Sequence, residues 1–416
     1  MTNPNSQDLT VGYCTNVHAG TDLPSIRRNL DEYAVQVRKN LQDDSDLGLG
    51  SNHLPIGLWI PNNASQQLVQ GSAANDFGAF LKDRGLSAFT INGFPYDNFH
   101  QDIVKHRVYL PTWFQQERLD YTKRLAQILS ALIPLTRDSA SSGSISTLPI
   151  GWPNNPDAKD EIPASKQIQV AGENLREMAT YLSDLESKTG RKIVVAIEPE
   201  PGCILDSTND IIEFFEKQLP DSEHRRYITV CHDICHSAVM MEKQSYVIKQ
   251  LATNQIGIGK VQVSSAIVAD WEAMADGRRV EAISQLSAFA EDRYLHQTGR
   301  LNSAGQFSLV EDLPSIIRND GIPVDDARWV VHFHVPIFLE RFEHLSTSQP
   351  DVVECLRTLI GPDALSTEGL AVDFSGHLEI ETYAWTVLPE SMQKRGLADD
   401  ISSEFQWLQK AILMCG

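Results

Sequence analysis

The sequence contains no long hydrophobic run. No stretch approaches the roughly 18 consecutive apolar residues that a membrane-spanning helix needs. The N-terminal segment MTNPNSQDLT also lacks the basic and apolar regions of a secretory signal peptide. We therefore expect a cytoplasmic protein that does not insert into a membrane.

Cysteine is sparse and irregularly spaced. The 416 residues include six cysteines, and no two of them form a CxxC pair. Disulfide-stabilised domains are small and dense in cysteine, so the sequence argues against that class of protein. We expect free thiols at positions 14, 203, 231, 235, 355 and 415.

Positive charge is also in short supply. Lys and Arg number 35 against 55 Asp and Glu, which gives a formal net charge of −20 at pH 7. A protein that binds nucleic acid through the phosphates usually presents a basic surface. We therefore expect no nucleic-acid partner, whereas a small polar metabolite or a divalent cation is compatible with this charge.

Short apolar runs alternate with amphipathic stretches along the chain. A hydrophobic content of 42% is enough for a large core. The polar residues 1–9 are expected to be flexible. The stretches between the apolar runs have the 3.6-residue period of helices, as at 166–188. The apolar runs themselves predict strands at 10–16, 54–61, 86–93, 144–150, 192–197, 227–232 and 259–264.

This alternation predicts an α/β fold, a (β/α)8 TIM barrel. Strands separated by helices form parallel βαβ units with right-handed crossovers. A typical barrel needs roughly 250 residues, so this chain must carry a long insertion, which we place after the seventh strand at about 265–376. Residues 329–337 and 378–383 compete to close the barrel, and we favour 378–383 because Pro336 is awkward in a central strand. We expect residues 10–416 to form a single elaborated barrel domain.

The stretch 192–202, KIVVAIEPEPG, joins an apolar strand to two acids. Pro199 and Pro201 cannot continue a strand ladder, so they end it. In a parallel barrel the C-terminal strand ends form the active-site face. Glu198 and Glu200 are two residues apart and would point to the same side. Acids after a strand are often only surface residues, but here the pattern recurs at later strands.

Potential metal ligands follow several predicted strands. Carboxylate, amide and imidazole groups suit a divalent cation such as Mn²⁺, Mg²⁺, Co²⁺ or Zn²⁺. Several carboxylates brought together would repel one another unless a cation neutralised them. The sequence therefore predicts a metal site built from some of these strand-end residues: Glu198, Asp233 with His236, Gln262, Glu379 or Glu381, and His332 with His334.

Two histidine motifs have other interpretations. HDICH at 232–236 resembles the HExxH motif of zinc proteases, but that motif needs a helix and YITVC predicts a strand before it. We interpret His232 as a hydrogen-bonded core residue. In HFH, His332 and His334 alternate as in a strand, and core packing or substrate contact is as good an interpretation as metal ligation.

These blocks resemble a known group of proteins. EPEP, DICH, KVQVSS and the late Glu resemble the xylose isomerase-like TIM barrels, which include sugar epimerases, hydroxypyruvate isomerase and endonuclease IV. Longer blocks such as FTINGFPY, VCHDICH and LEIETYAW resemble the metabolite-traffic proteins of the ebo gene clusters over nearly the whole chain. The resemblance implies that the metal is held by Glu198, Asp233, Gln262 and Glu381, with His236 near the substrate.

Two carboxylates around a cation suit an isomerase or epimerase that acts on a sugar, sugar phosphate or cyclitol. The cation would stabilise an enediolate, while Glu198 and Glu381 remove and return a proton. One alternative is a non-catalytic metabolite-binding or traffic protein on the same barrel. Another is a metal-dependent phosphodiesterase like endonuclease IV, which the acidic charge disfavours. We expect substrate contacts from His236, His334, His332, Asn92, His18 and Trp59.

Overall fold

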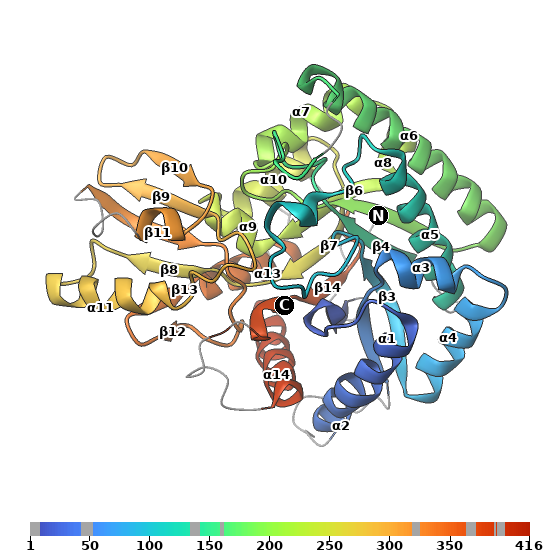
Figure 1. The fold of residues 1–416 in the computed structure, drawn as a ribbon, viewed down its shortest axis with the longest axis horizontal. Helices are drawn as coiled ribbons and strands as arrows, with labels where there is room; N and C mark the ends of the chain where they lie inside the picture. The colour runs from blue at the N-terminus through green and yellow to red at the C-terminus, as the bar shows by residue number, and fades with distance from the viewer. Residues whose placement is uncertain are drawn as a thin grey trace.

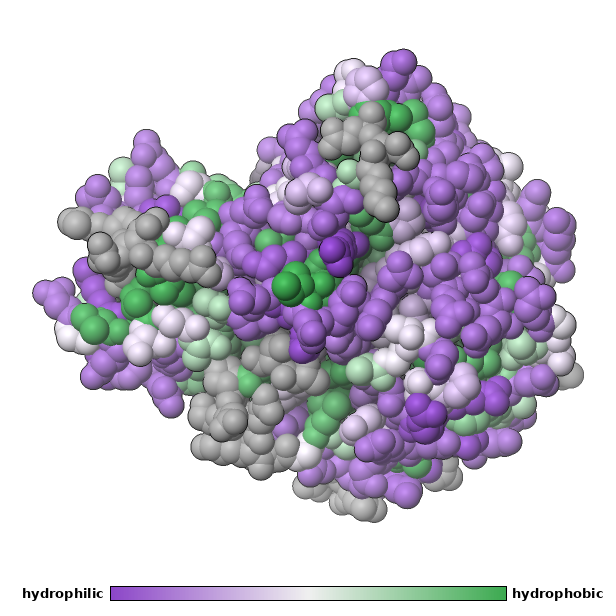
Figure 2. All heavy atoms as spheres, viewed as in Figure 1, coloured by the Kyte–Doolittle hydropathy of each residue, from purple (hydrophilic) through white to green (hydrophobic). Residues whose placement is uncertain are grey.

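The computed structural model describes most of the chain. It covers residues 9–42, 53–133, 142–158, 162–317, 325–362, 372–386, 388 and 396–416. The predicted flexible segment 1–9 lies outside this set except for Leu9. Hydrophilic residues cover most of the face shown in Figure 2. No helix in these ranges has the length and apolarity that crossing a membrane would require.

The larger sheet is a parallel barrel, which confirms the predicted (β/α)8 fold. Its eight strands follow the order β1-β14-β7-β6-β5-β4-β3-β2. The two ends of this order meet through a parallel bridge between Cys14 and Gly57, and the Trp59 N–H donates to Thr15 Oγ1 over 2.8 Å. The strands are β1 (Thr10–Tyr13), β2 (Leu54–Trp59), β3 (Leu86–Asn92), β4 (Ser142–Thr147), β5 (Lys192–Ile197), β6 (Ile228–Asp233), β7 (Ile258–Val263) and β14 (His377–Ile380).

The closing strand is β14, as predicted from residues 378–383. It pairs in parallel with β7 on one side and with β1 on the other. The competing segment 329–337 belongs to a second sheet, where β11 (Asp326–Val331) ends well before Pro336. The proline therefore lies in the irregular chain that returns from that sheet, where no ladder hydrogen bond is required of it.

Helices surround the barrel, as Figure 1 shows. Local sequence fixes several of their ends: α6 stops at Gly190, whose φ of 69° favours glycine, and Ser207 and Asp210 form a capping box for α7. The helices of the barrel are α1 (Leu23–Asn29), α2 (Val35–Gln42), α3 (Asn62–Leu68), α4 (Ala73–Asp83), α5 (Gln116–Leu132), α6 (Ala164–Thr189), α7 (Thr208–Gln218), α8 (Ser222–Arg225), α9 (Ile234–Val239), α10 (Gln244–Thr253), α13 (Gln349–Ile360) and α14 (Leu397–Cys415).

Between β7 and α13 the chain builds a second, antiparallel sheet that was not anticipated from the sequence. Its order is β10-β9-β11-β8-β13-β12, and it extends to one side of the barrel (Figure 1). Its strands are only two to six residues long, which makes their alternation hard to recognise in a sequence. Its elements are β8 (Ile267–Asp270), α11 (Asp276–Ser287), β9 (Thr298–Asn302), β10 (Phe307–Val310), α12 (Pro314–Ile317), β11, β12 (Arg341–Phe342) and β13 (Leu345–Thr347).

Helix α13 returns the chain to the barrel. Ser245, in α10, donates to Glu354 of α13 over 2.5 Å, and the thiol of Cys415, in α14, donates to the Val353 carbonyl over 3.8 Å. Thus α13 lies between its two neighbours in the ring of helices, as the helix of the seventh βα unit would. The residues added to the plain barrel are those between β7 and α13.

The barrel interior is polar beneath the C-terminal strand ends. Lys260 Nζ lies 2.5 Å from Glu379 Oε2, and both side chains are fully buried. Gly57 of β2 faces this pair, and a methyl group on its Cα would overlap the Glu379 carboxylate. Position 57 therefore requires glycine, because the Glu379 carboxylate lies too close to its Cα for any side chain.

Gly57→Ala should destabilise the protein. The added methyl must displace the Glu379 carboxylate from its ion pair, and such overpacking costs about 1–3 kcal/mol. Urea unfolding of the variant and the parent protein would measure this difference. Gly277→Ala is the control, because Gly277 lies in α11 and a methyl there meets no atom within 4 Å, so this variant should not lose stability and should gain up to about 1 kcal/mol from helix propensity. Equal unfolding midpoints for Gly57→Ala and the parent would contradict the interior arrangement.

Candidate functional site

The predicted oxygen ligands lie together at the C-terminal end of the barrel. Glu198 follows β5, Asp233 ends β6 and Glu381 follows β14. One carboxylate oxygen from each of these residues lies within 4.8 Å of the others. Backbone bonds hold two of these positions: Glu198 N–H donates to Thr147 O over 2.9 Å, and Glu381 N–H donates to Val263 O over 3.2 Å. The parallel strand ends therefore bring three acids to one point.

Gln262 faces the same interior. It is two residues from Lys260 on β7, so both side chains point into the barrel. Its Cα is in register with Asp233 of β6 and with Glu379 of β14. The side chain is fully buried, and neither its amide oxygen nor its amide nitrogen has a hydrogen-bond partner among the described residues.

The donor set fits a divalent cation. Glu198 Oε2 and Asp233 Oδ2 are buried and, like the Gln262 amide, have no hydrogen-bond partner in the ranges that the structure describes. An unsatisfied buried carboxylate oxygen is costly unless a cation or a donor meets it. Carboxylate and amide oxygens are ligands that Mg²⁺ and Mn²⁺ accept. Glu198, Asp233, Gln262 and Glu381 could therefore hold such an ion.

Two asparagines fix the Glu381 carboxylate. Asn16 Nδ2 and Asn92 Nδ2 each donate to Glu381 Oε1 over 2.8 Å. Asn92 was predicted as a substrate contact, and both asparagines also line the pocket above the acids. Asn16 was missed, although its place at the end of a predicted strand was a usable signal. Neither asparagine contacts the other carboxylate oxygen of Glu381, Oε2.

The surroundings shift the pKa values of the three acids in different directions. Burial, followed by repulsion from Glu381 and Asp233, raises the pKa of Glu198 well above its ordinary value. Burial, followed by repulsion from Asp233 and Glu379, does the same to the pKa of Glu381. Burial alone would also raise the pKa of Asp233, but His236, His334 and a hydrogen bond from Ser264 outweigh it and lower that pKa. Of the three acids, Asp233 is therefore the one whose ionised form its surroundings favour.

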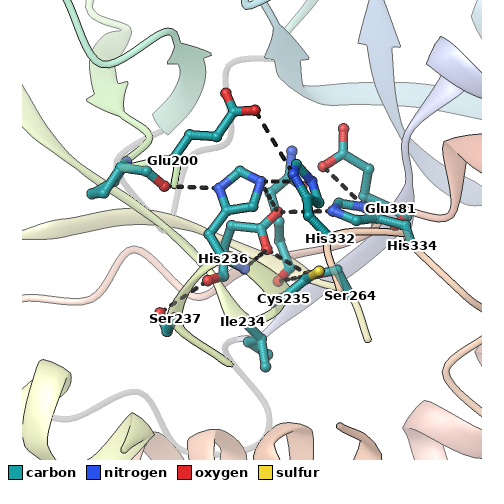
Figure 3. A network of polar contacts seen from close by, with 12 residues as sticks. Glu200, Ile234, Cys235, His236, Ser237, Ser264, His332, His334 and Glu381 are labelled. Carbon is teal, nitrogen blue, oxygen red and sulfur yellow. Dashed lines mark hydrogen bonds and ion pairs between the residues drawn. The ribbon is translucent and has the colours of Figure 1, made fainter. Parts of the chain in front are cut away.

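Three histidines form a second face of the site (Figure 3). Each has its Nδ1 beside an oxygen that can only accept: His236 beside Pro199 O at 2.8 Å, His332 beside Gln297 Oε1 at 2.8 Å, and His334 beside Glu381 O at 2.7 Å. Nδ1 must therefore carry the proton in each ring, which leaves a lone pair on Nε2. This is how proteins prepare histidines to bind metals.

The Nε2 atoms converge. His236 Nε2 and His332 Nε2 are 3.2 Å apart, and Asp233 Oδ2 lies 3.8 Å from Nε2 of both His236 and His334. Burial lowers the pKa of His334 to about 4 and the pKa of His332 well below its ordinary value. Two facing lone pairs at this separation need a proton or a cation between them. The histidine face could hold an ion next to the carboxylate position.

The added sheet supplies part of this face. His332 follows β11, and Gln297 precedes β9. Gln297 Nε2 also donates to Tyr109 OH and to Glu200 Oε1, over 3.1 and 3.2 Å, and Tyr109 OH donates to Glu200 Oε1 over 2.8 Å. Glu200 therefore points into the site, as its spacing from Glu198 suggested. Gln297 and Tyr109 were missed, because only tertiary contact brings them here.

Three other residues singled out in the sequence lie outside this constellation. His18 bonds to Tyr13 OH over 3.0 Å and stacks on Tyr33. Trp59 donates to Pro95 O over 3.0 Å and contacts the ring of Phe99, so it lies behind the pocket wall. His232 lies on the outer side of β6, where its Nε2 is 2.7 Å from Gln244 Oε1 of α10. The strand placement of His232 excludes the zinc-protease interpretation.

A buried pocket opens directly above the acids. Its polar lining includes Glu198, Glu200, Glu381, Lys105, the two asparagines and the three histidines, whereas Phe94, Phe99, Val104, Tyr294 and Leu295 are among its apolar walls. These walls come from the loop after β3 and from the added sheet. The arrangement offers a small molecule a floor of carboxylates that could hold a metal and a wall of apolar side chains.

Comparison with known proteins finds similar structures, but neither a protein-family model nor a curated protein sequence matches the chain. Among solved structures, it is similar to a xylose isomerase-like TIM barrel protein from Mycobacterium smegmatis in complex with magnesium, with 11% identity, a TM-score of 0.48 and coverage of 98% of this chain and 99% of the other. A xylose isomerase domain protein from Alicyclobacillus acidocaldarius shows 14% identity, a TM-score of 0.45 and the same coverage.

A third similar structure, the IOLI protein with a bound zinc atom, shows 11% identity, a TM-score of 0.45 and coverage of 98% of this chain and 99% of the other. These values describe a loose similarity of architecture. The assignment of the barrel rests on the strand order and pairing given above.

Metal uptake should release protons. Because burial and mutual repulsion raise the pKa values of Glu198 and Glu381 without a cation, a cation that binds these carboxylates should displace protons from them. Affinity for Mn²⁺ should therefore rise with increasing pH. Calorimetry in buffers of different ionisation enthalpy measures the protons released. Glu381→Gln should release fewer, whereas affinity independent of pH with no proton release would contradict the site.

Proposed function

We propose that this protein is a divalent-metal-dependent isomerase or epimerase that acts on a hydroxy-carbonyl compound such as a sugar or cyclitol. The observation that supports this most is the convergence of Glu198, Asp233 and Glu381 within 4.8 Å, with Glu198 and Glu381 at the floor of a pocket. Such a floor can both hold a cation and move protons. The ligands would be Glu198, Asp233, Gln262 and Glu381.

A cation held there would polarise a substrate carbonyl and stabilise an enediolate. The protein's own groups do the rest. Glu198 and Glu381 come from β5 and β14, which are separated in the sheet by β6 and β7, so they approach a bound substrate from different directions. One carboxylate removes a proton from carbon and the other returns one. Asn16 and Asn92 keep the Glu381 carboxylate oriented for this transfer.

The remaining pocket residues would bind and shield the substrate. His334 Nε2 is buried without a hydrogen-bond partner among the described residues, so it can accept a hydrogen bond from a substrate hydroxyl. His236 and His332, whose Nε2 atoms lie 3.2 Å apart, also line the pocket. Glu200 is held by Tyr109 and Gln297 at the pocket wall and can also accept. The apolar walls exclude water, which strengthens these polar interactions.

The test is solvent deuterium exchange. Metal-loaded protein, incubated in deuterated water with ketoses, their phosphates and cyclitol ketones, should introduce deuterium at the carbon next to a carbonyl of at least one compound. Mass spectrometry and NMR detect the exchange. Bound metal with no exchange across the panel would instead fit a non-catalytic metabolite-binding or traffic protein, and no metal uptake would overturn the site assignment.

Glu381→Gln and His334→Gln separate the roles of the two late residues. Glu381→Gln should lower metal content and reduce exchange by at least about a hundredfold, since it removes both a ligand charge and a proton carrier. His334→Gln should leave the metal bound. Glu216→Gln, on the exposed surface of α7, is the matched control and should behave as the parent does. Loss of metal only from the His334 variant would reverse the assignment.

The histidine face favours a second candidate, a phosphodiesterase with two adjacent cations. Two ions can stabilise both the attacking and the leaving oxygen of a phosphate ester. Against this, the net charge of −20 opposes a polyanionic substrate. Metal-loaded protein should leave bis(p-nitrophenyl) phosphate intact. Its hydrolysis, together with uptake of two ions per chain, would favour this candidate over the isomerase.

A further inference from the structure

The passage from the pocket above the acids toward a wider surface groove is lined by apolar side chains. Four residues line both the pocket above the acids and a wider groove at the surface: Pro95, Phe99, Val104 and Val108. They therefore stand between the metal-binding floor and solvent. A substituent on a substrate bound at the floor can extend toward the groove between them. In Figure 2 a small hydrophobic patch lies among hydrophilic residues near the middle of this face.

This passage is preformed. The backbone N–H groups of Val104 and Lys105 donate to Arg293 O over 2.8 and 3.0 Å, and Tyr294 OH donates to Phe99 O over 3.1 Å. The loop after β3 is thus bonded to the added sheet across the top of the barrel. Because hydrogen bonds already hold the walls, a ligand does not have to order them.

The pocket is poorly equipped for a phosphate ester. Among its described lining residues Lys105 is the one Lys or Arg, and its Nζ already lies 2.8 Å from Asp312 Oδ2. Phosphate recognition normally uses Arg, Lys or clustered backbone N–H groups. The acids at the floor would repel a second anion.

We propose that the substrate carries an uncharged apolar or aromatic substituent beside the oxygen atoms that reach the floor, and that phosphate esters are poor ligands. This inference rests on the proposed metal-dependent function and narrows its substrate class. An apolar group gains free energy when it leaves water for such a passage. The wider groove beyond the passage contains polar and charged residues such as Gln101, Arg107 and Asp157, so the apolar part of the ligand should be short. Arg107 is paired with Asp157, with Nε 3.6 Å from Oδ1.

Three hydroxamates test the proposal, because each offers the same pair of oxygens to a metal. They are acetohydroxamate, benzohydroxamate and phosphoglycolohydroxamate. Calorimetry on Mn²⁺-loaded protein should show benzohydroxamate binding at least about tenfold more tightly than acetohydroxamate, because its ring is buried in the passage. Phosphoglycolohydroxamate should bind no more tightly than acetohydroxamate. Equal affinity of the first two, or tightest binding of the phosphate, would overturn the proposal.

Val108→Lys and Ile103→Lys form a matched pair on one loop. Val108 lines the passage, whereas Ile103 is 56% exposed and belongs to neither lining. Val108→Lys should remove most of the preference for benzohydroxamate and improve binding of the phosphate compound. Ile103→Lys should change neither. If the lysine at position 108 prevents folding, Val108→Ala should still reduce the preference several-fold. An unchanged preference in a folded Val108 variant would exclude this passage.

Failure of the proposed metal-dependent function and failure of the proposed substrate class give different results. If the protein takes up no metal, the proposed function fails, and the passage is then tested on the metal-free protein by ligand-observed NMR. Benzohydroxamate should show stronger saturation transfer than acetohydroxamate, and Val108→Lys should abolish the difference. If metal binds but the ring gives no advantage, the substrate class is wrong while the metal site stands.

Discussion

The burial of three carboxylates in one small volume constrains the whole active end of the barrel. Glu198, Asp233 and Glu381 repel one another in a region of low dielectric, so the acids cannot all be ionised without compensation. Lys260 lies below them but is already paired with Glu379. The negative charge that remains is best balanced by a cation. Many of the surrounding contacts hold the three carboxylates in positions where they could share such a cation.

The barrel and the added sheet make different contributions to the site. The barrel supplies the oxygens, fixed by parallel strand ends and by the two asparagines on Glu381. The chain after β11 supplies His332 and His334, whose Nδ1 atoms are held by Gln297 and by the Glu381 carbonyl. A barrel without this sheet would keep the carboxylates but lose two of the three histidines. The sheet therefore belongs to the site as well as to the periphery of the fold.

The same sheet also closes the pocket. Gln297 joins Glu200 and Tyr109, which belong to the barrel and to the loop after β3. Glu404 of α14 accepts from the Ile337 N–H and from Thr382 Oγ1, over 3.2 and 2.6 Å, and so ties the returning chain to the residue after Glu381. Burial raises the pKa of Glu404 to about 8. These hydrogen bonds connect the added sheet, the loop after β3 and the chain that follows Glu381 into one structure.

The sequence by itself determined the barrel and the oxygen-bearing side chains at its strand ends. The run from Lys192 to Ile197 and its counterparts are local patterns, and parallel strands bring their C-terminal ends together whatever the intervening residues. It also pointed to residues 378–383 rather than 329–337 as the closing strand, because the position of Pro336 is a local signal. These features follow from short-range chemistry and from a general rule of parallel barrels.

Only the tertiary structure decided the second sheet, the histidine orientations and the pocket wall. The sheet's strands are too short to show a period, and their antiparallel pairing depends on contacts between distant segments. Which nitrogen of a histidine faces the site depends on its partner: His236 and His332 are separated by 96 residues, yet their Nε2 atoms meet at 3.2 Å. Such contacts leave no trace in local sequence, because the free energy that selects them arises only when both segments are packed.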